Sequence, residues 1–182
     1  DKLAIIEAHR FNLPGVHIIV RPKRNYIFGA FASHLIGYMG EITDKELRSS
    51  DFAHYKLGDM IGRYGIEAKW EKFLTGESGK KQVEVDSAGR QLNILFIQPP
   101  IPGADISLTI DKQLQREAEK LLDGKCGAIV ALNPKSGEVL AMVSSPDFDP
   151  NEFIKGITPE RWKELNDLSG SPLQNRAISG TY

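Results

Sequence analysis

Two short patterns in the sequence could contribute to catalysis by a nucleophilic serine. Lys135-Ser136-Gly137 places a lysine beside a serine, and Ser78-x-x-Lys81 separates the two residue types by three positions. On a helix, that separation brings the lysine amine to the serine hydroxyl, where the amine can accept the hydroxyl proton. Whether either pattern can do so depends on the element that carries it.

The first pattern lies in the stretch NPKSG, residues 133–137, between the apolar runs AIVAL and EVLAMV. Asn133 can begin a turn, and Pro134 fixes φ at the second position. Gly137 can supply the positive φ of a type I turn with a G1 bulge. We therefore predict that this stretch is the tip of a β-hairpin, which would leave Lys135 in water with no catalytic serine opposite it.

The second pattern lies between a helix and a strand. Ser78 follows Gly76, which can end a helix, and Lys81 leads into the β-pattern QVEV. The helical geometry is therefore missing, and a solvated loop is predicted. The four histidines show no metal-ligand spacing; they are His9, His17, His34 and His54. We expect no catalytic residue, no cofactor-binding residue and no metal ligand in this chain.

Composition favours a globular protein and excludes several classes. Of the 182 residues, 41% are hydrophobic and 26% are charged, with a net charge of −1. The balanced charge argues against a nucleic-acid binder. The single cysteine, Cys126, excludes an internal disulfide and a cysteine-rich zinc site. No apolar run is long enough to cross a membrane. The chain opens inside a predicted helix and stops at AISGTY, so we expect a piece of a longer protein.

Periodicity before residue 99 predicts mixed α and β elements. We expect a helix over 3–11, a strand over 15–20, a short helix or turn over 30–37, a capped helix start at Thr43, a helix over 65–76 and a β-hairpin over 82–97. The helix over 65–76 should present Ile66, Trp70, Phe73 and Leu74 on one face. The alternation in the hairpin predicts one buried face.

The stretch from Pro99 to Gly103 contains three prolines and one glycine, so it cannot continue a helix or a central strand. We place a domain boundary there, with one domain over 1–103 and another over 104–182. After it we expect a strand over 106–110, a helix capped by Asp111, and an apolar hairpin over 128–143. In a complete domain this hairpin should be covered on both faces, and in a truncated chain it should lack cover and leave an exposed apolar patch. The helix should bury Leu114, Ala118, Leu121 and Leu122 against that hairpin.

Together these segments resemble a known family. ADISLTIDKQLQREAEKLL, GAIVALNPKSGEVLAMVSSPDFDPN and PLQNRAISGTY are similar to the start of the transpeptidase domain of class B penicillin-binding proteins, of the elongation type. Arg24-x-Tyr26-x-x-Gly29, with His34 and Gly37, is similar to a motif of the family's non-catalytic pedestal (dimerisation) domain, as is Gly62-x-x-Gly65-Ile66-Glu67. Ile27 stands where the family usually has proline.

The resemblance implies an α+β fold, in which a mixed pedestal domain precedes the opening strand, helix and hairpin of the transpeptidase. It also implies an arginine partner for Glu67, for which Arg24 is the first candidate and Arg90 the second. Family members continue past Gly180-Thr181-Tyr182 into the Ser-x-x-Lys run that holds the nucleophile. No catalytic residue of the family can therefore be assigned to a position of this chain.

For the parent protein, the resemblance implies a D,D-transpeptidase that crosslinks peptidoglycan stem peptides and is trapped by β-lactams. It implies no cofactor, an N-terminal membrane anchor and a periplasmic location. The implied partners are a membrane glycosyltransferase and a rod-shape scaffold protein. Two alternatives stay open: a free-standing interaction module, and the septal paralogue of the same family.

Overall fold

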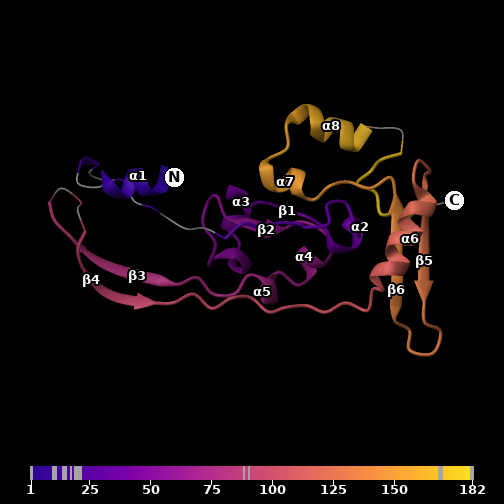
Figure 1. Ribbon diagram of the computed structural model, residues 1–182, viewed down its shortest axis with the longest axis horizontal. Helices are drawn as coiled ribbons and strands as arrows, with labels where there is room; N and C mark the ends of the chain where they lie inside the picture. Colours follow the sequence, from indigo (N-terminus) through magenta and orange to yellow (C-terminus); the bar gives the residue numbers. More distant parts are fainter. Residues whose placement is uncertain are drawn as a thin grey trace. The chain divides into compact units, whose positions relative to one another are not determined.

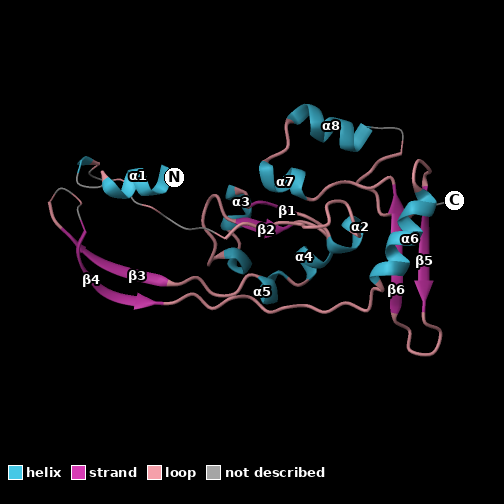
Figure 2. Ribbon diagram, viewed as in Figure 1, coloured by secondary structure: helices cyan, strands magenta, loops and turns pink. Residues whose placement is uncertain are grey.

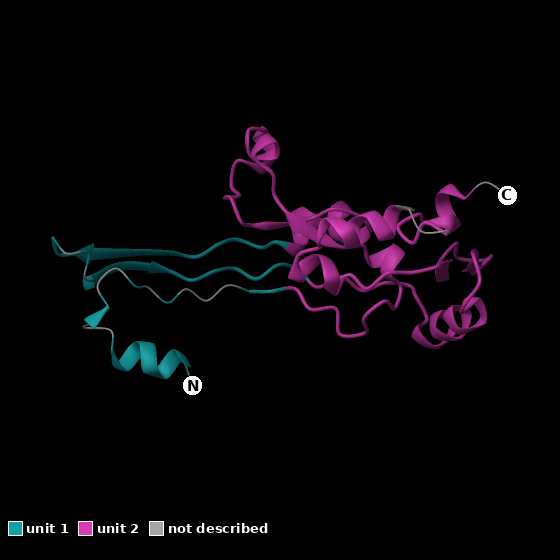
Figure 3. Cartoon of the chain, turned by 90° about the horizontal axis from the view of Figure 1, so that it is seen from above, with its two compact units in different colours: residues 1–23, 75–104 teal, residues 24–74, 105–182 magenta. Residues whose placement is uncertain are grey.

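The computed structural model describes residues 2–9, 12, 13, 16, 18, 22–87, 89, 91–167 and 170–180 (Figures 1 and 2). It contains two compact units. Unit 1 comprises residues 1–23 and 75–104, and unit 2 comprises residues 24–74 and 105–182 (Figure 3). One boundary between the units follows Ala104, next to the exposed proline-rich stretch. The division into domains 1–103 and 104–182 stays a prediction.

The fold is α+β, as predicted. Unit 1 holds α1 (Lys2–Ala8), β3 (Lys80–Val85) and β4 (Gln91–Gln98). The first part of unit 2 holds α2 (Ser33–Ile36), β1 (Met39–Glu41), α3 (Asp44–Leu47), the 3₁₀ helix η2 (Ser50–Phe52), β2 (Met60–Gly62), α4 (Gly65–Lys69) and α5 (Glu71–Leu74). Its second part holds α6 (Lys112–Leu122), β5 (Gly127–Leu132), β6 (Val139–Ser145), α7 (Asn151–Lys155), α8 (Pro159–Asp167) and α9 (Arg176–Ser179). The strands form three antiparallel pairs, β1–β2, β3–β4 and β5–β6.

The predicted hairpin of unit 1 forms, but its burial differs from the expectation. β3 and β4 pair antiparallel with Val83 opposite Ile94. Ile94, Phe96 and Ile97 are 50%, 54% and 58% exposed, so large apolar side chains of β4 lie in water. The expectation of one buried face was wrong because the described part of unit 1 supplies no third strand or long helix to cover this ribbon. The strand expected over 15–20 falls largely outside the described residues.

The helix expected over 65–76 is interrupted at Trp70. Trp70 has φ −111° and ψ 17°, and it separates α4 from α5. The Glu71 carboxylate accepts a hydrogen bond from the Gly62 N–H at 2.7 Å and one from the Tyr55 hydroxyl at 2.5 Å. These bonds hold the start of α5 at the end of β2. The prediction of one continuous helix over 65–76 was therefore wrong, and Trp70 and Phe73 are 44% and 58% exposed.

Glycines of the pedestal motifs allow two backbone segments to touch. A Cβ on Gly37, at the end of α2, would overlap the carbonyl oxygen of Tyr64. A Cβ on Gly65 would meet the Leu35 carbonyl oxygen at 2.6 Å, and one on Gly62 would overlap the backbone of Glu67. Gly37 and Gly65 also have positive φ, of 85° and 63°. Only glycine combines this backbone conformation with so close an approach.

The second part of unit 2 is built around the β5–β6 hairpin. As predicted, α6 packs on this hairpin, mainly on β6, and Asp111 caps the helix by accepting from the N–H groups of Gln113 and Leu114. Its buried residues are Gln115 and Ala118, whereas Leu114 and Leu121 are 40% and 67% exposed. Of the predicted apolar face, Ala118 is therefore buried as expected, whereas Leu114 and Leu121 are not, because the polar residue Gln115 occupies the contact with β6.

The strand expected over 106–110 does not form in this described segment. Instead, the Thr109 hydroxyl donates to the Val139 carbonyl oxygen at 2.7 Å, and the Asp111 N–H donates to the Leu140 carbonyl oxygen at 2.8 Å. These two hydrogen bonds provide partners for the first two carbonyl oxygens of β6 without a neighbouring strand.

Cover of the β5–β6 hairpin is one-sided. Ala141 and Val143 on β6 are buried, but Val130 and Leu132 on β5 are 46% and 58% exposed. The cover on both faces that a complete domain would give is missing, because the described helices α6 and α9 leave these two β5 side chains in water.

Gly37→Ala and Gly137→Ala should differ in cost although both glycines have positive φ. Gly137 has φ 77° and open space around its Cβ position, so alanine should cost only the backbone strain of about 1 kcal/mol. At Gly37 the overlap with Tyr64 adds to that strain, for a total of about 2–4 kcal/mol. Urea unfolding of both variants measures the difference, and equal losses would contradict this account of the Gly37 contact.

Candidate functional site

Neither serine pattern has catalytic geometry. Lys135-Ser136-Gly137 forms the tip of the β5–β6 hairpin, as predicted: Gly137 has φ 77° and its N–H donates to the Asn133 carbonyl oxygen at 2.8 Å. The Asn133 side chain accepts from the Lys135 N–H at 3.0 Å, which fixes the turn from within. The Ser136 hydroxyl donates to the Glu138 carboxylate at 2.6 Å, two residues along the same exposed turn, and Lys135 is not its hydrogen-bond partner there. This stretch is a turn.

Ser78 also lies where the sequence predicted, in an exposed loop before β3. The Lys81 amine donates to the Gln91 side chain at 3.2 Å, across the hairpin. Among the described residues no group of three or more His, Cys, Asp and Glu side chains is arranged to hold a metal ion. That this chain carries no catalytic residue stays a prediction.

The candidate site is instead a network of buried contacts in unit 2, where residues of the pedestal motifs contact the segments after residue 105. Glu67 on α4 is 4% exposed, and its carboxylate binds the Arg24 guanidinium through two atoms, at 2.8 Å and 2.9 Å. The Tyr26 hydroxyl donates to the same carboxylate at 3.1 Å. The predicted pairing of Glu67 with Arg24 is confirmed, while the alternative partner, Arg90, lies outside the described residues. Burial, followed by the Glu67 charge, raises the pKa of Tyr26.

The backbone of Tyr26 continues this network into α7. The Tyr26 N–H donates to Asn151 Oδ1 at 3.0 Å, and Asn151 Nδ2 donates to the Tyr26 carbonyl oxygen at 2.9 Å. Asp149 accepts a further bond from Asn151 Nδ2 at 2.9 Å, which orients the amide. One side chain thus pairs with both polar groups of a residue 125 positions earlier. Nothing in the sequence around Asn151 indicated this pairing.

His34 makes a second contact of the same kind. Its ring is 4% exposed, and Nε2 donates to the Pro172 carbonyl oxygen at 2.7 Å. Burial lowers the pKa of His34, the hydrogen bond to Pro172 partly opposes this, and the positive charge of Arg176 adds to the lowering, so the net shift of the pKa is downward. The Asn175 amide lies 3.5 Å from the His34 carbonyl oxygen, and its Oδ1 caps α9 by accepting from the Ala177 N–H. The capping residue could have been recognised from the sequence, but its contact with His34 could not.

Aromatic rings fill the space between these polar contacts. Tyr38 stacks on Phe153 with ring centroids 3.8 Å apart. Phe148, which is 4% exposed, meets the rings of His34, Tyr38 and Phe153 edge-on at 5.1, 5.8 and 5.7 Å. Such edge-on pairs are favourable beyond the area that they bury. The two sets of motifs therefore share one packed interior in unit 2.

Comparison with known proteins agrees with this arrangement. Residues 1–108 match the family model of the penicillin-binding protein dimerisation domain, and residues 127–182 match that of the penicillin-binding protein transpeptidase domain. The chain belongs to the penicillin-binding protein family.

Its similarity within the family is to the elongation type. Peptidoglycan D,D-transpeptidase MrdA of Acinetobacter baumannii is 42% identical over 95% of this chain and 26% of that protein. MrdA of Escherichia coli K12 is 37% identical over 100% of this chain and 29% of that protein. The chain thus spans less than a third of the length of these relatives. The resemblance to a class B penicillin-binding protein of the elongation type is confirmed.

A solved structure has the same fold. The complex between penicillin-binding protein PBP2 and MreC from Helicobacter pylori matches with a TM-score of 0.77 and 32% identity. The match covers 96% of this chain and 32% of that chain.

Arg24→Ala should destabilise unit 2, because among the described residues it leaves the buried Glu67 carboxylate with only the Tyr26 hydroxyl as a hydrogen-bond partner. Loss of a hydrogen-bonded charged partner costs about 1.5–3 kcal/mol. Arg24→Lys should recover only part of this, since an ammonium cannot bind both oxygens in the plane of the carboxylate. Lys23→Ala, at the exposed neighbouring position, is the control for chemical denaturation. Equal losses in Arg24→Ala and Lys23→Ala would show that the pair contributes nothing.

His34 should make stability depend on pH below its ordinary pKa. Because burial lowers the native pKa from 6.5, the unfolded chain binds a proton at pH values where the native His34 does not. The free energy of unfolding should therefore fall as the pH drops below about 6.5, by at most about 1.4 kcal/mol per pH unit. His34→Gln keeps a donor for Pro172 but removes the titration.

Denaturation curves at pH 7.5 and 5.5 test this. The difference between the two should shrink in His34→Gln and persist in His54→Gln, since His54 is exposed. An unchanged difference in both variants would refute the assignment to His34.

Proposed function

We propose that this chain is part of a peptidoglycan D,D-transpeptidase that crosslinks stem peptides during cell-wall elongation. The observation that carries the proposal is the match to MrdA relatives over nearly the whole chain, with the two family models in the same order along it. The Arg24–Glu67 pair and the glycine contacts of unit 2 support it, because they give the motif residues definite structural roles.

In this proposal the reaction is acyl transfer through a serine ester. The serine oxygen attacks the carbonyl carbon between the two D-alanines, the C–N bond breaks, and the terminal D-alanine leaves with the proton on its amine. An amine of a second stem then attacks the ester, forms the crosslink and returns the proton to the serine. Backbone donors stabilise the oxyanion in both steps. The residues that do this chemistry belong to the remainder of the transpeptidase domain.

The pedestal and the opening of the transpeptidase domain are what this chain contributes. Their shared interior holds α7, α9 and the β5–β6 hairpin in a fixed relation to the pedestal motifs. The protein would be anchored in the inner membrane, act in the periplasm and bind β-lactams as substrate mimics. Within the described residues, no helix is long and apolar enough to cross a membrane.

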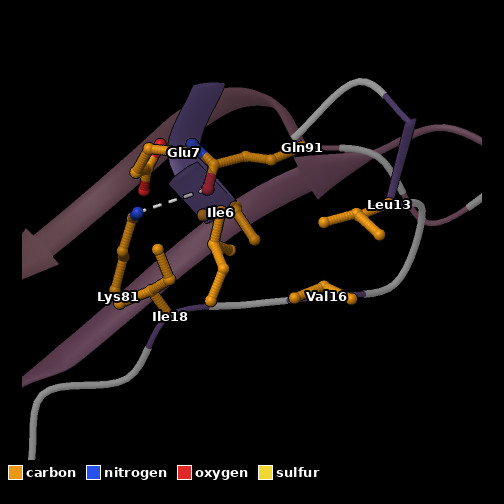
Figure 4. A pocket seen from close by; sticks show the side chains of 8 residues that line it. Ile6, Glu7, Leu13, Val16, Ile18, Lys81 and Gln91 are labelled. Atoms are coloured by element: carbon orange, nitrogen blue, oxygen red, sulfur yellow. Dashed lines mark hydrogen bonds between the residues drawn. The ribbon is translucent and has the colours of Figure 1, made fainter. Parts of the chain in front are cut away.

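A second, compatible function is protein binding by unit 1. A pocket of about 320 Å³ in this unit is lined by apolar side chains from the segment around α1 and by Val83 of β3, together with the polar side chains of Glu7, Lys81 and Gln91 (Figure 4). Exposed apolar residues follow along β4. The Helicobacter pylori PBP2 was solved in complex with MreC, so a rod-shape scaffold protein of that type is the partner that we propose. A membrane glycosyltransferase is a further partner implied by the family resemblance.

Labelling with a fluorescent penicillin tests the proposed reaction. The 182-residue chain should form no covalent adduct, whereas a chain extended through the downstream Ser-x-x-Lys and Lys-Ser/Thr-Gly elements should acylate. Gel fluorescence of both lengths, with boiled protein as the control, gives the result. A band on the short chain that disappears in Ser78→Ala would mean that Ser78 is a nucleophile after all. An extended chain that does not acylate would overturn the proposed reaction.

A further inference from the structure

The turn that begins α2 is hydrogen-bonded to residues from the second part of unit 2. We call residues 32–34 the α2 clamp. The Ala32 N–H donates to the Glu119 carboxylate on α6 at 2.8 Å. Two residues later, His34 donates to the Pro172 carbonyl oxygen. The clamp is therefore fixed on one side by α6 and on the other by the segment that leads into α9.

Glu119 connects the clamp to β6 as well. Its Oε1 also accepts from Gln115 Nε2 at 2.9 Å. The Gln115 amide is fully buried and pairs with both backbone groups of Met142 on β6, at 2.8 Å and 3.0 Å. The hydrogen-bonded side chains of Glu119 and Gln115 thus connect the Ala32 backbone to β6, so a displacement of Ala32 would also displace β6.

The start of α9 is tied to the same strand. The Ser144 hydroxyl, on β6, donates to the Gln174 carbonyl oxygen at 3.1 Å and accepts from the Arg176 N–H at 2.9 Å. Residues 172–176 are consequently held at two places, by Ser144 on β6 and by His34 in the clamp.

Backbone strain coincides with these contacts. Among the described residues, only Ala32 and Ser171 have positive φ without being glycine, at 51° and 36°. One lies in the clamp and the other immediately precedes Pro172. The Ser33 hydroxyl, between Ala32 and His34, is buried without a hydrogen-bond partner. Strained residues and unsatisfied buried groups persist where the surroundings fix them and are concentrated at functional sites.

We propose that Glu119 and His34 are positioning residues for acyl transfer: through the α2 clamp they set the position of α9 relative to β6. The inference rests on the proposed function, in which the chain after α9 leads toward the nucleophile. Neither side chain would touch the substrate. Their effect would be on the orientation of the reacting serine, where a displacement of about 1 Å can cost on the order of a hundredfold in rate.

The test uses the full-length protein and separates positioning from folding. Stopped-flow measurement with a fluorescent penicillin gives the acylation rate constant of the bound complex, and titration gives the fraction of protein that acylates. Glu119→Ala and His34→Ala should lower the rate constant about ten- to hundredfold while nearly all of the protein still acylates. Glu119→Gln should retain most of the rate, because its amide oxygen can accept from Ala32 and Gln115.

Two control variants match these changes. Glu117→Ala removes an exposed carboxylate of the same helix, which pairs only with Lys120 among the contacts described. His54→Ala removes an exposed imidazole whose ring lies tilted against that of Tyr55. Neither should change the rate constant. Should the alanine variants fail to fold, Glu119→Asp compared with Glu119→Gln gives the same contrast, because the shorter carboxylate cannot reach Ala32 without a backbone shift.

Unchanged rate constants in Glu119→Ala and His34→Ala would overturn the proposal, and so would a loss that appears only as a smaller acylating fraction. A wild-type protein that does not acylate would overturn the proposed function instead. In that case hydrogen exchange of residues 171–180 decides whether the clamp exists. His34→Ala should speed this exchange and His54→Ala should not, and equal exchange in both would refute the clamp.

Discussion

The buried carboxylate of Glu67 is the constraint on which unit 2 depends. A charge that is 4% exposed is tolerated only when it is paired and hydrogen-bonded, which Arg24 and Tyr26 provide. Gly62 lets the backbone of Glu67 approach β2, since any Cβ there would overlap it. Tyr26 in turn is bound through its backbone by Asn151. Residues that are far apart in the sequence thus belong to one network.

Polar and aromatic contacts have different tasks in this interior. Stacking of Tyr38 on Phe153 and the edge-on packing of Phe148 supply buried area, but rings tolerate small rotations and shifts. The hydrogen bonds of His34 and Asn151 fix direction and register, because a buried donor or acceptor that loses its partner is costly. Apolar packing therefore holds the segments together, and the polar contacts determine which single arrangement they adopt.

What the sequence could predict was local or carried by a motif. The turn at Gly137 follows from residue types within five positions, and the pairing of Glu67 with Arg24 followed from the family motifs and the preference of a helix start for a carboxylate. The break at Trp70 could not be predicted, because helical periodicity continues through it and the cause is the bond from Gly62 to Glu71. Burial of Gln115 shifted the expected face of α6 by about one position, since a pattern of apolar residues does not indicate a buried polar side chain that pairs with a distant backbone.

Side-chain amides join distant segments of unit 2 at several places, and their chemistry explains why. An amide offers a donor and an acceptor in one plane, as a strand neighbour does, so it can pair with both groups of a single residue. Asn151 does this for Tyr26, and Gln115 does it for Met142. Asn175 divides the same two functions between the α9 cap and the His34 carbonyl oxygen. A carboxylate could supply only the acceptor, and an apolar side chain neither. At each of these positions a backbone N–H or carbonyl group would then lose its hydrogen-bond partner. An amide is therefore the side chain that can pair with both of these backbone groups.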